Sequence, residues 1–460
     1  MRSPQPHFFR GPRNRAQVLS ALATLALVGS GGCERQAQEP QADTSLSHER
    51  VRLAKAPDDL RIPDEYIVVF SEGVTGMAID AAANQIARAG GANSLMHPYS
   101  VIPGFAARLD KAELDRLMRN PGVASIHENQ QVSLTGLVPS PADGIDRADQ
   151  RQGHDGTYND HGSTGAGVHV YVLDTGLNAE HSEFSGRVGE GFTSVVDGLG
   201  TDDCNGHGTH VSSTIAGTLY GMAKEATVHP VRVLRCTGKG SWAGIIAGLN
   251  FVGTHCPLQD GPCVVNMSLA GETFVPVNTA VANLVNQGIT VVVAAGNDNV
   301  DACTRSPSSE PKAITVAAVD DADTRAGFSN WGQCVDLFAP GVSILGASIG
   351  DAVATHVDDG TSMASPHVAG AVAQYLSTHR SATPTQINTN LKASATLDCV
   401  LHPQNSPNVL LFSDLNQGNF VCAAPGSCVG LCGEAADGCF CDPGCAEFGD
   451  CCPDYAQVCE

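Results

Sequence analysis

The sequence predicts an α/β domain in which parallel strands end at polar residues and lead into helices. Residues 168–172 form a β-branched run typical of a buried strand, and Asp174 and Gly176 follow at its end. A second apolar run, residues 289–295, ends close to Asn297. Functional residues of open α/β sheets gather at the carboxyl ends of the strands, so Asp174 and Asn297 are candidates for a functional site.

A predicted helix start carries the most informative residue, Ser362. Two small residues precede it, and apolar residues recur at helical spacing over residues 368–376. The first N–H groups of a helix lack partners within the helix and favour negative charge. An oxyanion formed when this hydroxyl attacks a carbonyl would therefore be stabilised there. A serine in this position is also a common helix cap, so the segment alone leaves both interpretations open.

A third segment places glycines on both sides of His207, before another helix-like run. A carboxylate, an imidazole and a hydroxyl thus each lie at the start or end of an element, in the chain order Asp174, His207, Ser362. This is the subtilisin order of a catalytic triad and differs from the order in α/β-hydrolases. A lone Asp or His is usually structural, but three such contexts together favour catalysis.

Two other catalytic interpretations fail on spacing. A zinc-protease helix needs a glutamate within His-Glu-x-x-His, whereas His207 and His210 are three residues apart with no acid between them. A lipase-type Gly-x-Ser-x-Gly would need a glycine at Ala364, with the acid and the histidine following the serine. His210 and His367 lie inside helix-like runs, which predicts packing or capping roles for both.

The chain resembles the subtilases, and among them the proteinase K and aqualysin group. The resemblance covers about residues 144–412, and four segments carry it: residues 173–176, 205–210, 294–297 and 360–364. It implies a doubly wound, mostly parallel α/β sheet and a serine endopeptidase. The alternative is a catalytically silent relative that acts as a secreted binding protein. The presence of all four candidate site residues favours the enzyme.

The resemblance implies a role for each of these residues. Ser362 would be the nucleophile, His207 the base and later the acid, and Asp174 the group that orients the imidazole. Asn297 would donate its side-chain amide to the oxyanion. Taken alone, Asn297 also suits a turn, because its neighbours are rich in turn-forming residues.

The same resemblance implies that a polypeptide substrate adds to the enzyme as an extended strand. Two segments would hold it: Gly238, Lys239 and Gly240 on one side, and Ser268, Leu269, Ala270 and Gly271 on the other. The family commonly has glycine at Ala270, and the extra methyl would narrow a pocket. Trp242 would line a distal apolar pocket, with a plain core position as the alternative.

Three further residues would border the pocket for the residue before the scissile bond: Ala294, Ala295 and Gly296. None of them is charged. We therefore expect cleavage after apolar or aromatic residues rather than after lysine or arginine.

Composition predicts an exported protein that does not bind polyanions. Its 460 residues exceed one ordinary domain, and 48 acidic against 26 basic side chains give a formal charge of -22. Nucleic acids and anionic membranes need clustered positive charge, so neither is expected as a partner. Seventeen cysteines are typical of an exported protein. One is Cys33, eight lie in the catalytic region and eight in the last 33 residues.

The eight cysteines of the catalytic region suggest four disulfides. By resemblance to aqualysin, Cys204 pairs with Cys236 and Cys303 with Cys334. Proximity in sequence suggests the pairs Cys256–Cys263 and Cys399–Cys422.

Residues 1–33 read as an export signal, because three arginines precede an apolar stretch over residues 18–28. The stretch is too short to be a stable membrane anchor. Residues 30–33 resemble a bacterial lipoprotein processing box, although that box usually begins with leucine, so the precursor could be lipid-anchored at Cys33. Residues 34–60 are polar and suggest a linker to the next domain.

Residues 61–136 are predicted to form a small α+β domain. Strand-like runs at 65–70, 105–109 and 123–126 alternate with helix-like runs at 77–89 and 111–119. The block resembles the inhibitory propeptide of subtilases, whose tail fills the active site. We expect removal by a cut near residues 134–137, upstream of a catalytic domain assigned to residues 137–422.

The last block, residues 424–460, resembles a somatomedin B module, a four-bridge disulfide knot that usually binds other proteins. So short a segment cannot build a hydrophobic core without disulfides. Zinc binding is the rival, but the block contains no histidine. We expect an unidentified protein partner for this module, and a monomeric enzyme.

Acidic residues also suggest a structural calcium cofactor. Two groups are candidate ligands: Asp146, Asp149, Gln150 and Asp155, and separately Pro311, Ala313 and Asp336. The first resembles a calcium loop of cold-adapted relatives but is one residue shorter. The second matches a proteinase K site built from two backbone carbonyls and a carboxylate. A solvated acidic surface is the alternative for both.

Overall fold

The computed structural model describes residues 51–133 apart from 52, 58, 59, 91 and 92, residues 144–422, and two short strands near the C-terminus. The chain divides into two units, Met1–His48 and Glu49–Glu460, and all described residues belong to the second. The predicted export signal, Cys33 and the expected cleavage position lie outside the described residues. So does nearly all of the cysteine-rich block.

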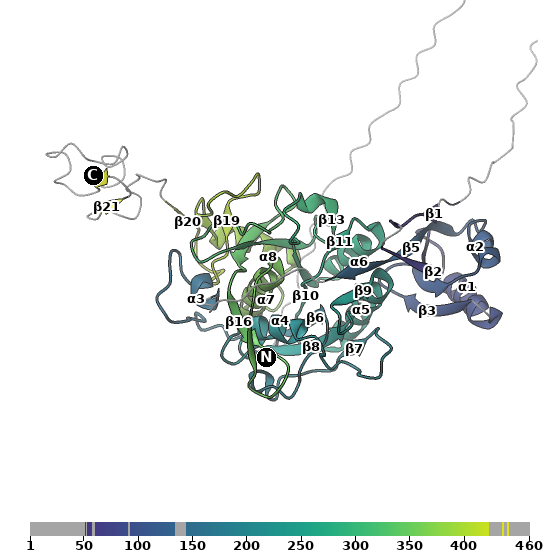
Figure 1. Ribbon diagram of the computed structural model, residues 1–460, viewed down its shortest axis with the longest axis horizontal. Coiled ribbons are helices and arrows are strands. Elements are labelled where there is room, and N and C mark those ends of the chain that lie inside the picture. Colours follow the sequence, from purple (N-terminus) through teal and green to yellow (C-terminus); the bar gives the residue numbers. More distant parts are fainter. Residues whose placement is uncertain are drawn as a thin grey trace, which may run out of the picture. The chain divides into compact units, whose positions relative to one another are not determined.

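A ten-stranded sheet forms the centre of the larger domain (Figure 1). Its strands, from one edge to the other, are β7 (Phe192–Thr193), β8 (Thr227–Arg232), β6 (His169–Asp174), β10 (Cys263–Met267), β12 (Thr290–Ala294), β14 (Ile314–Val319), β15 (Leu337–Pro340), β19 (Val409–Leu410), β18 (Thr396–Leu397) and β20 (Phe420–Val421). Neighbours pair in parallel except β18 with β19. Every residue of β10, β12 and β14 is buried, as expected for parallel strands covered on both faces.

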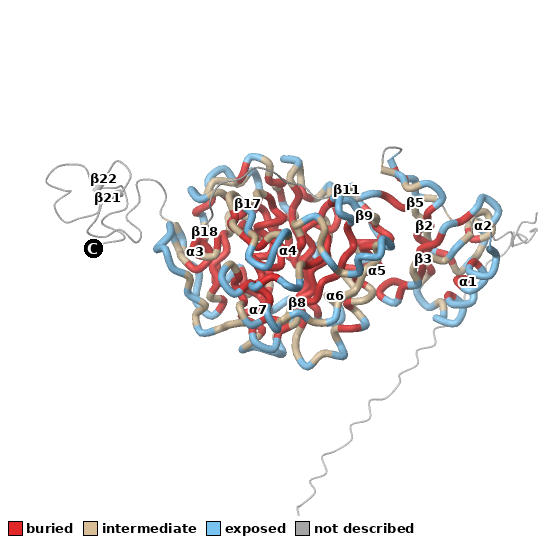
Figure 2. The backbone as a smooth tube through the Cα atoms, turned by 60° about the horizontal axis from the view of Figure 1, so that its bottom comes forward, coloured by how far each residue is buried: buried red, intermediate tan, exposed pale blue. Residues whose placement is uncertain are grey.

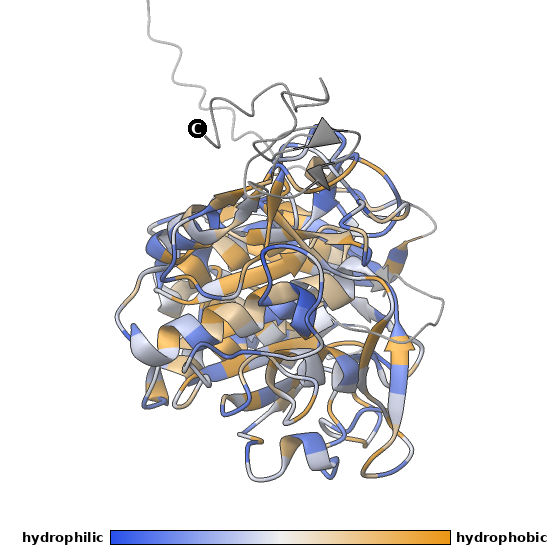
Figure 3. Ribbon diagram, turned by 90° about the vertical axis from the view of Figure 1, so that its left-hand side faces the viewer, coloured by the Kyte–Doolittle hydropathy of each residue, from blue (hydrophilic) through white to orange (hydrophobic). Residues whose placement is uncertain are grey.

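Helices cover both faces of this sheet. They are α3 (Gly144–Ala148), α4 (His207–Ala216), α5 (Trp242–His255), α6 (Val275–Asn286), α7 (Thr361–Thr378) and α8 (Pro384–Ser394). In β6, Val170 and Val172 belong to the core that includes α4 and α7, whereas Tyr171 and Leu173 belong to the core that includes α5 and α6. This alternation is the strand period of two, and it confirms the predicted doubly wound α/β fold. Figures 2 and 3 show the buried, apolar strands between these layers.

The residues from Leu53 to Ser133 form a second layered structure with its own core, in which the short strand β1 precedes the block predicted from residue 61. Its strands are β1 (Leu53–Ala54), β2 (Arg61–Phe70), β3 (Ser94–Tyr99), β4 (Gly104–Arg108) and β5 (Val123–Ser133), in the order β1-β5-β2-β4-β3, with helices α1 (Gly76–Ala89) and α2 (Lys111–Leu117). The sequence pattern missed β3. That strand lies at the sheet edge, where Pro98 removes no central ladder bond.

The smaller domain packs on α5 and α6 of the larger one. The Tyr99 hydroxyl donates to the backbone oxygen of Ala243 at 3.1 Å, and Asn283 Nδ2 donates to the Val101 oxygen at 2.6 Å. Val101 and Ile102 are almost fully buried in the same core as α5 and α6. The two domains therefore share part of one hydrophobic core.

The remaining elements are short. They are β9 (Lys239–Ser241), β11 (Gly271–Glu272), β13 (Arg305–Ser306), β16 (Ile344–Ala347), β17 (Thr355–Asp358), β21 (Ala435–Ala436) and β22 (Cys439–Phe440), with the 3-10 turns η1 (Ser182–Phe184), η2 (Cys256–Leu258) and η3 (Ala302–Thr304). Two antiparallel pairings matter for the site: β9 with β5, and β16 with β17. Among the residues described here, no helix is long and apolar enough to cross a membrane.

Candidate active site

A contact between a carboxylate and an imidazole joins the end of β6 to the start of α4. Asp174 is the last residue of β6 and fully buried, and His207 is the first residue of α4. His207 Nδ1 lies 2.8 Å from Asp174 Oδ1. Gly208 lets the start of α4 pack closely against the turn after β6, because a Cβ at this position would lie 2.3 Å from the backbone oxygen of Gly176. The carboxylate therefore fixes which nitrogen of the imidazole faces away from it.

Opposing effects set the charge state of His207. Burial alone would lower its pKa, but the charge and hydrogen bond of Asp174 raise it, and the carboxylates of Asp358 and Asp203 add to the rise. The net result is a pKa above the ordinary value. Its Nε2 is buried and has no hydrogen-bond partner among the residues that the structure describes. This imidazole is suited to accept a proton and hold it as a cation.

Ser362 lies in the first turn of α7, behind the cap residue Gly360. The Ser362 side chain is fully buried, and its Oγ donates to the backbone oxygen of Ser268 at 3.2 Å. In return, Ser268 Oγ donates to the backbone oxygen of Ser362 at 2.8 Å. The hydroxyl is thus held at a helix N-terminus, where backbone N–H groups face a developing negative charge. In this structure the Ser362 hydroxyl makes its hydrogen bond with Ser268.

Asn297 is tied to the same helix start. Its Oδ1 accepts hydrogen bonds from the backbone nitrogen and the Oγ1 of Thr361, at 2.9 and 2.7 Å. Thr361 Oγ1 in turn accepts from the Gly296 nitrogen at 3.0 Å. Because the oxygen end of the amide is held by the residue next to Ser362, Nδ2 is the end that can donate to an oxyanion.

Asp203, which was not among the residues predicted from the sequence, organises the loop before α4. Its Oδ1 accepts from Thr175 Oγ1 at 2.9 Å and from the Gly206 nitrogen at 3.0 Å. Its Oδ2 accepts from the nitrogen and the Oγ1 of Thr209 at 2.9 and 2.7 Å. An acid just before a glycine-bounded helix start was the available signal.

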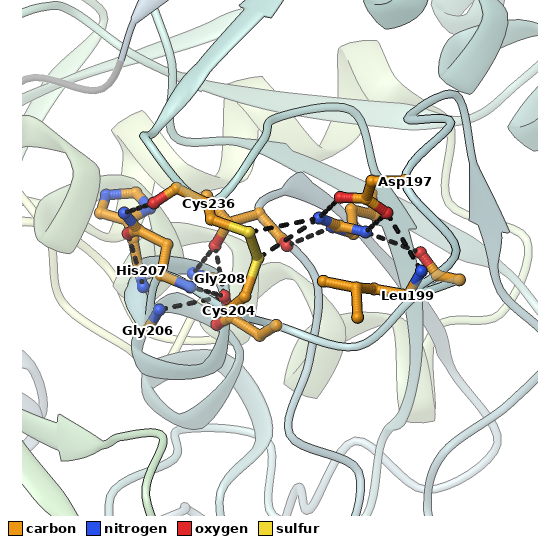
Figure 4. The surroundings of a disulfide bond; sticks show 12 residues. Asp197, Leu199, Cys204, Gly206, His207, Gly208 and Cys236 are labelled. Carbon is orange, nitrogen blue, oxygen red and sulfur yellow. Dashed lines mark hydrogen bonds and ion pairs between the residues drawn. A yellow bond between two sulfur atoms is a disulfide. The ribbon is translucent and has the colours of Figure 1, made fainter.

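A disulfide holds the same loop from outside. Cys204 and Cys236 are joined, and Figure 4 shows this bridge close to His207. The buried Arg232 lies on its other side, where it binds Asp197 through both terminal nitrogens at 2.8 and 2.6 Å. The structure also joins Cys256 to Cys263, Cys303 to Cys334, and Cys399 to Cys422. These are the four pairs expected from the sequence.

The end of β5 occupies the position expected for an extended substrate. Gln131 pairs with Ser241, Val132 with Gly240 and Ser133 with Lys239 in an antiparallel register. β5 also contacts β11, which begins at Gly271. The segment therefore runs between the two chain segments that the sequence suggested for substrate binding.

The residues expected around the apolar pockets lie at the end of β12 and directly after β9. Ala294 and Ala295 are buried at the end of β12, and Gly296 follows with a φ of +102°. A Cβ at Gly296 would lie 2.4 Å from Asn330 Nδ2 and 3.7 Å from the Ala270 methyl. Ala270 thus faces the space beside Gly296. Trp242 follows β9 directly and is fully buried, stacked on Phe274 with ring centroids 5.8 Å apart.

Two histidines near the site have structural roles. His210 is buried and its Nε2 lies 2.9 Å from the Ile344 oxygen, while His367 Nδ1 lies 2.8 Å from the Met363 oxygen. Burial lowers the pKa of each to about 4, so both are neutral at physiological pH. They pack within the core, as their helical context predicted.

The first candidate calcium group concentrates charge. Asp149 is buried, and burial raises its pKa to about 6, with the charges of Asp146 and Asp155 contributing and backbone hydrogen bonds opposing the rise. Asp146 accepts from the backbone nitrogens of Asp155 and Gly156, which folds the loop around it. Within the described part of the chain, no three His, Cys, Asp or Glu side chains converge as they would around a bound metal.

In the second candidate group, a lysine pairs with the carboxylate. Asp336 Oδ1 accepts a hydrogen bond from Lys392 Nζ at 2.7 Å, and its Oδ2 accepts from the Thr315 nitrogen at 2.9 Å. Lys392 also lines a cavity of about 570 Å³ together with Pro311. Lys392 Nζ therefore pairs with the carboxylate that the sequence proposed as a calcium ligand together with Pro311 and Ala313.

Comparisons with known protein families divide the chain into three parts. The pattern described as "Subtilase family" matches residues 165–419. The pattern described as "Peptidase inhibitor I9" matches residues 65–135, and that described as "Somatomedin B domain" matches residues 426–460.

Individual proteins agree with the family patterns. The "Extracellular serine proteinase" of Thermus sp. (strain Rt41A) is 49% identical over 317 residues, or 68% of this chain and 76% of that protein. The "Alkaline serine exoprotease A" of Vibrio alginolyticus is 39% identical over 415 residues, or 86% of this chain and 76% of that one. The crystal structure of "a cold adapted subtilisin-like serine proteinase" matches with a TM-score of 0.57 at 43% identity, over 60% of this chain and 99% of that chain.

Proposed function

Because this chain belongs to the subtilase family, we propose that it is a secreted serine endopeptidase whose catalytic groups are Asp174, His207 and Ser362. One observation carries the assignment of roles: the 2.8 Å contact of Asp174 with His207 Nδ1 leaves Nε2 as the proton acceptor. Ser362 supplies a hydroxyl at a helix N-terminus. The protein is made as a zymogen with an inhibitor-type propeptide.

Hydrolysis proceeds in two steps, acylation of Ser362 and hydrolysis of the acyl-enzyme. Ser362 Oγ turns from Ser268 toward His207, passes its proton to Nε2 and forms a bond to the substrate carbonyl carbon. The oxyanion is held by the Ser362 N–H and the Asn297 amide. The imidazolium gives its proton to the departing amine as the peptide bond breaks, which leaves an acyl-enzyme. A water molecule then attacks the acyl carbon and gives a proton to His207 Nε2. The bond to Ser362 Oγ breaks as that oxygen takes the proton back, which releases the acid product.

The substrate preference follows from the uncharged residues beside Gly296. Ala294, Ala295 and the Ala270 methyl offer no partner for a basic side chain before the scissile bond. We propose apolar or aromatic residues at that position, with the substrate backbone added between β9 and the segment that ends at Gly271.

The propeptide is proposed to span residues 61–136 and to be cut near residues 134–137. The register of β5 on β9 supports this, since it delivers Ser133 to the substrate groove. The catalytic domain then spans 137–422 and the disulfide module 424–460, whose protein partner is unidentified. A lipid at Cys33, upstream of the cut, would stay with the propeptide when the enzyme is released.

A serine-directed phosphonate tests the proposed catalytic function. The reagent labels only a serine that its own enzyme has activated, so we expect one adduct on processed protein, mapped to Ser362 by peptide mass spectrometry. Labelling should disappear in a His207→Ala variant that keeps its thermal unfolding transition. Processed, folded protein that takes up no reagent would identify the chain as a silent binding protein instead.

We also propose one structural calcium ion, bound by Asp146, Asp149 and Asp155 with Gln150. The charges of Asp146 and Asp155 both act on the Asp149 carboxylate, and a divalent cation would relieve this repulsion. When calcium is bound it supplies only charge and cross-linking at this loop. At the second candidate group, Lys392 would compete with calcium for the Asp336 carboxylate.

Calcium should raise the melting temperature of the mature enzyme. At a concentration 100 times Kd, an ion that binds only the folded state stabilises it by about 2.7 kcal/mol. The midpoint should therefore rise by several degrees between chelator and millimolar calcium. Asp149→Asn should remove most of the rise, whereas Asp336→Asn should lower stability and leave the calcium response intact. A midpoint that is constant across the series would exclude the site.

A further inference from the structure

The β16–β17 hairpin turns one face toward the helix that carries His207. Its register places Ile344 opposite Asp358 and Gly346 opposite His356. Residues directly opposite in an antiparallel pair lie on the same face. A Cβ at Gly346 would point at the His210 ring of α4, 2.8 Å away. The face that bears His356 and Asp358 is therefore the face turned to α4.

Asp358 lies at the level of the first turn of α4. The Ile344 oxygen opposite it contacts His210 Nε2 at 2.9 Å, and His207 lies three residues earlier on the same side of the helix. The Asp358 side chain is 18% exposed, and its Oδ1 lies 3.5 Å from His356 Nε2. Asp358 therefore sits between the catalytic imidazole and solvent.

Charged groups act on His207 from each element packed around it. Asp174 belongs to β6, Asp203 to the preceding loop and Asp358 to β17, while His210 lies on α4 itself. Burial raises the pKa of Asp358, and the charges of His207 and His356 lower it in part. The interaction between Asp358 and His207 thus acts in both directions, as it must for two neighbouring charges.

The hairpin is on the leaving-group side of the scissile bond. β5 pairs with β9 and precedes the expected cut, so β9 marks the side of the residues before that bond. The hairpin instead contacts α4 at His210, one turn beyond His207, the group that gives its proton to the departing amine, and β17 ends at Asp358, shortly before Ser362 in the chain. A side chain just after the scissile bond would therefore meet Asp358.

We propose that Asp358 is a selectivity residue for the leaving-group side, where its carboxylate favours a lysine or arginine immediately after the scissile bond. The inference rests on the proposed function and adds a second element of substrate choice to it.

Matched peptides test this proposal with mature enzyme whose active sites have been counted by phosphonate titration. Two internally quenched peptides share apolar residues before the scissile bond and differ only after it, with lysine in one and leucine in the other. We expect wild-type kcat/KM to favour lysine. Asp358→Asn should reduce the lysine-to-leucine ratio about two- to fivefold, the range for a partly exposed ion pair. Asp358→Lys should invert the ratio, and Asp358→Glu should restore it.

The pH profile gives a second readout that a purely structural role would not move. Hydrolysis needs neutral His207, so activity rises as the pH passes the pKa of that group. Asp358 raises this pKa, hence Asp358→Asn should shift the acid limb to lower pH. Asp351→Asn removes the same charge from the loop of the same hairpin and should change neither the ratio nor the limb. An unchanged ratio in Asp358→Asn and Asp358→Lys would overturn the proposal, while wild-type protein inactive on both peptides would overturn the proposed function itself.

Discussion

Secreted Ser362→Ala protein will accumulate as an uncut precursor. The change removes the attacking oxygen and little volume, and the buried site is held by contacts that do not need the hydroxyl, such as Asn297 with Thr361. The variant should therefore fold with its propeptide in the substrate groove. In subtilisin, loss of the nucleophile costs about a millionfold in kcat, so processing within any practical time is not expected.

Intact-mass analysis of purified Ser362→Ala protein is the measurement, made without other proteases present. Ser377→Ala supplies the matched control, because it removes a hydroxyl near the far end of the same helix, where Ser377 Oγ donates only to the Gln374 oxygen. The control should be processed as in wild type. A Ser362→Ala product already cut between residues 130 and 142 would show that an external protease activates the zymogen.

Asn297→Ala should lower kcat by about 10²–10³-fold, equivalent to about 3–4 kcal/mol of transition-state stabilisation. KM should change little, because the amide acts on the oxyanion and not on the bound ground state. Steady-state kinetics on a neutral peptide, with active sites counted, gives both constants.

A second variant separates the oxyanion role from simple positioning. Thr361→Val removes the Oγ1 that binds Asn297 Oδ1 at 2.7 Å but keeps the backbone bond at 2.9 Å and the donor end of the amide. Its loss in kcat should be much smaller than that of Asn297→Ala. If both variants lose activity equally, Asn297 acts by holding the start of α7 and not by donating to the oxyanion.

The fold and the candidate catalytic residues could be predicted because their signals are local. Asp174 ends a strand, and His207 and Ser362 begin helices, so one-dimensional patterns place all three at the same edge of a parallel sheet. The buried runs of β10, β12 and β14 likewise follow from a sheet covered on both faces.

Residues whose roles depend on long-range contacts could not be predicted in this way. Lys392 lies 56 residues from Asp336, so nothing in the sequence near Asp336 indicates their ion pair. Asp358 faces His207 only because the register of β16 and β17 turns it toward α4. The edge strand β3 was missed because its polar residues and Pro98 are unlike those of a buried strand.

The shared hydrophobic core of the two domains has a further consequence for durability. Val101 and Ile102 lie in the core that α5 and α6 share with the central strands, so release of the propeptide, as proposed, would take these apolar side chains out of that core. The precursor would then have a larger free energy of unfolding than the released enzyme, because less apolar surface stays buried after release.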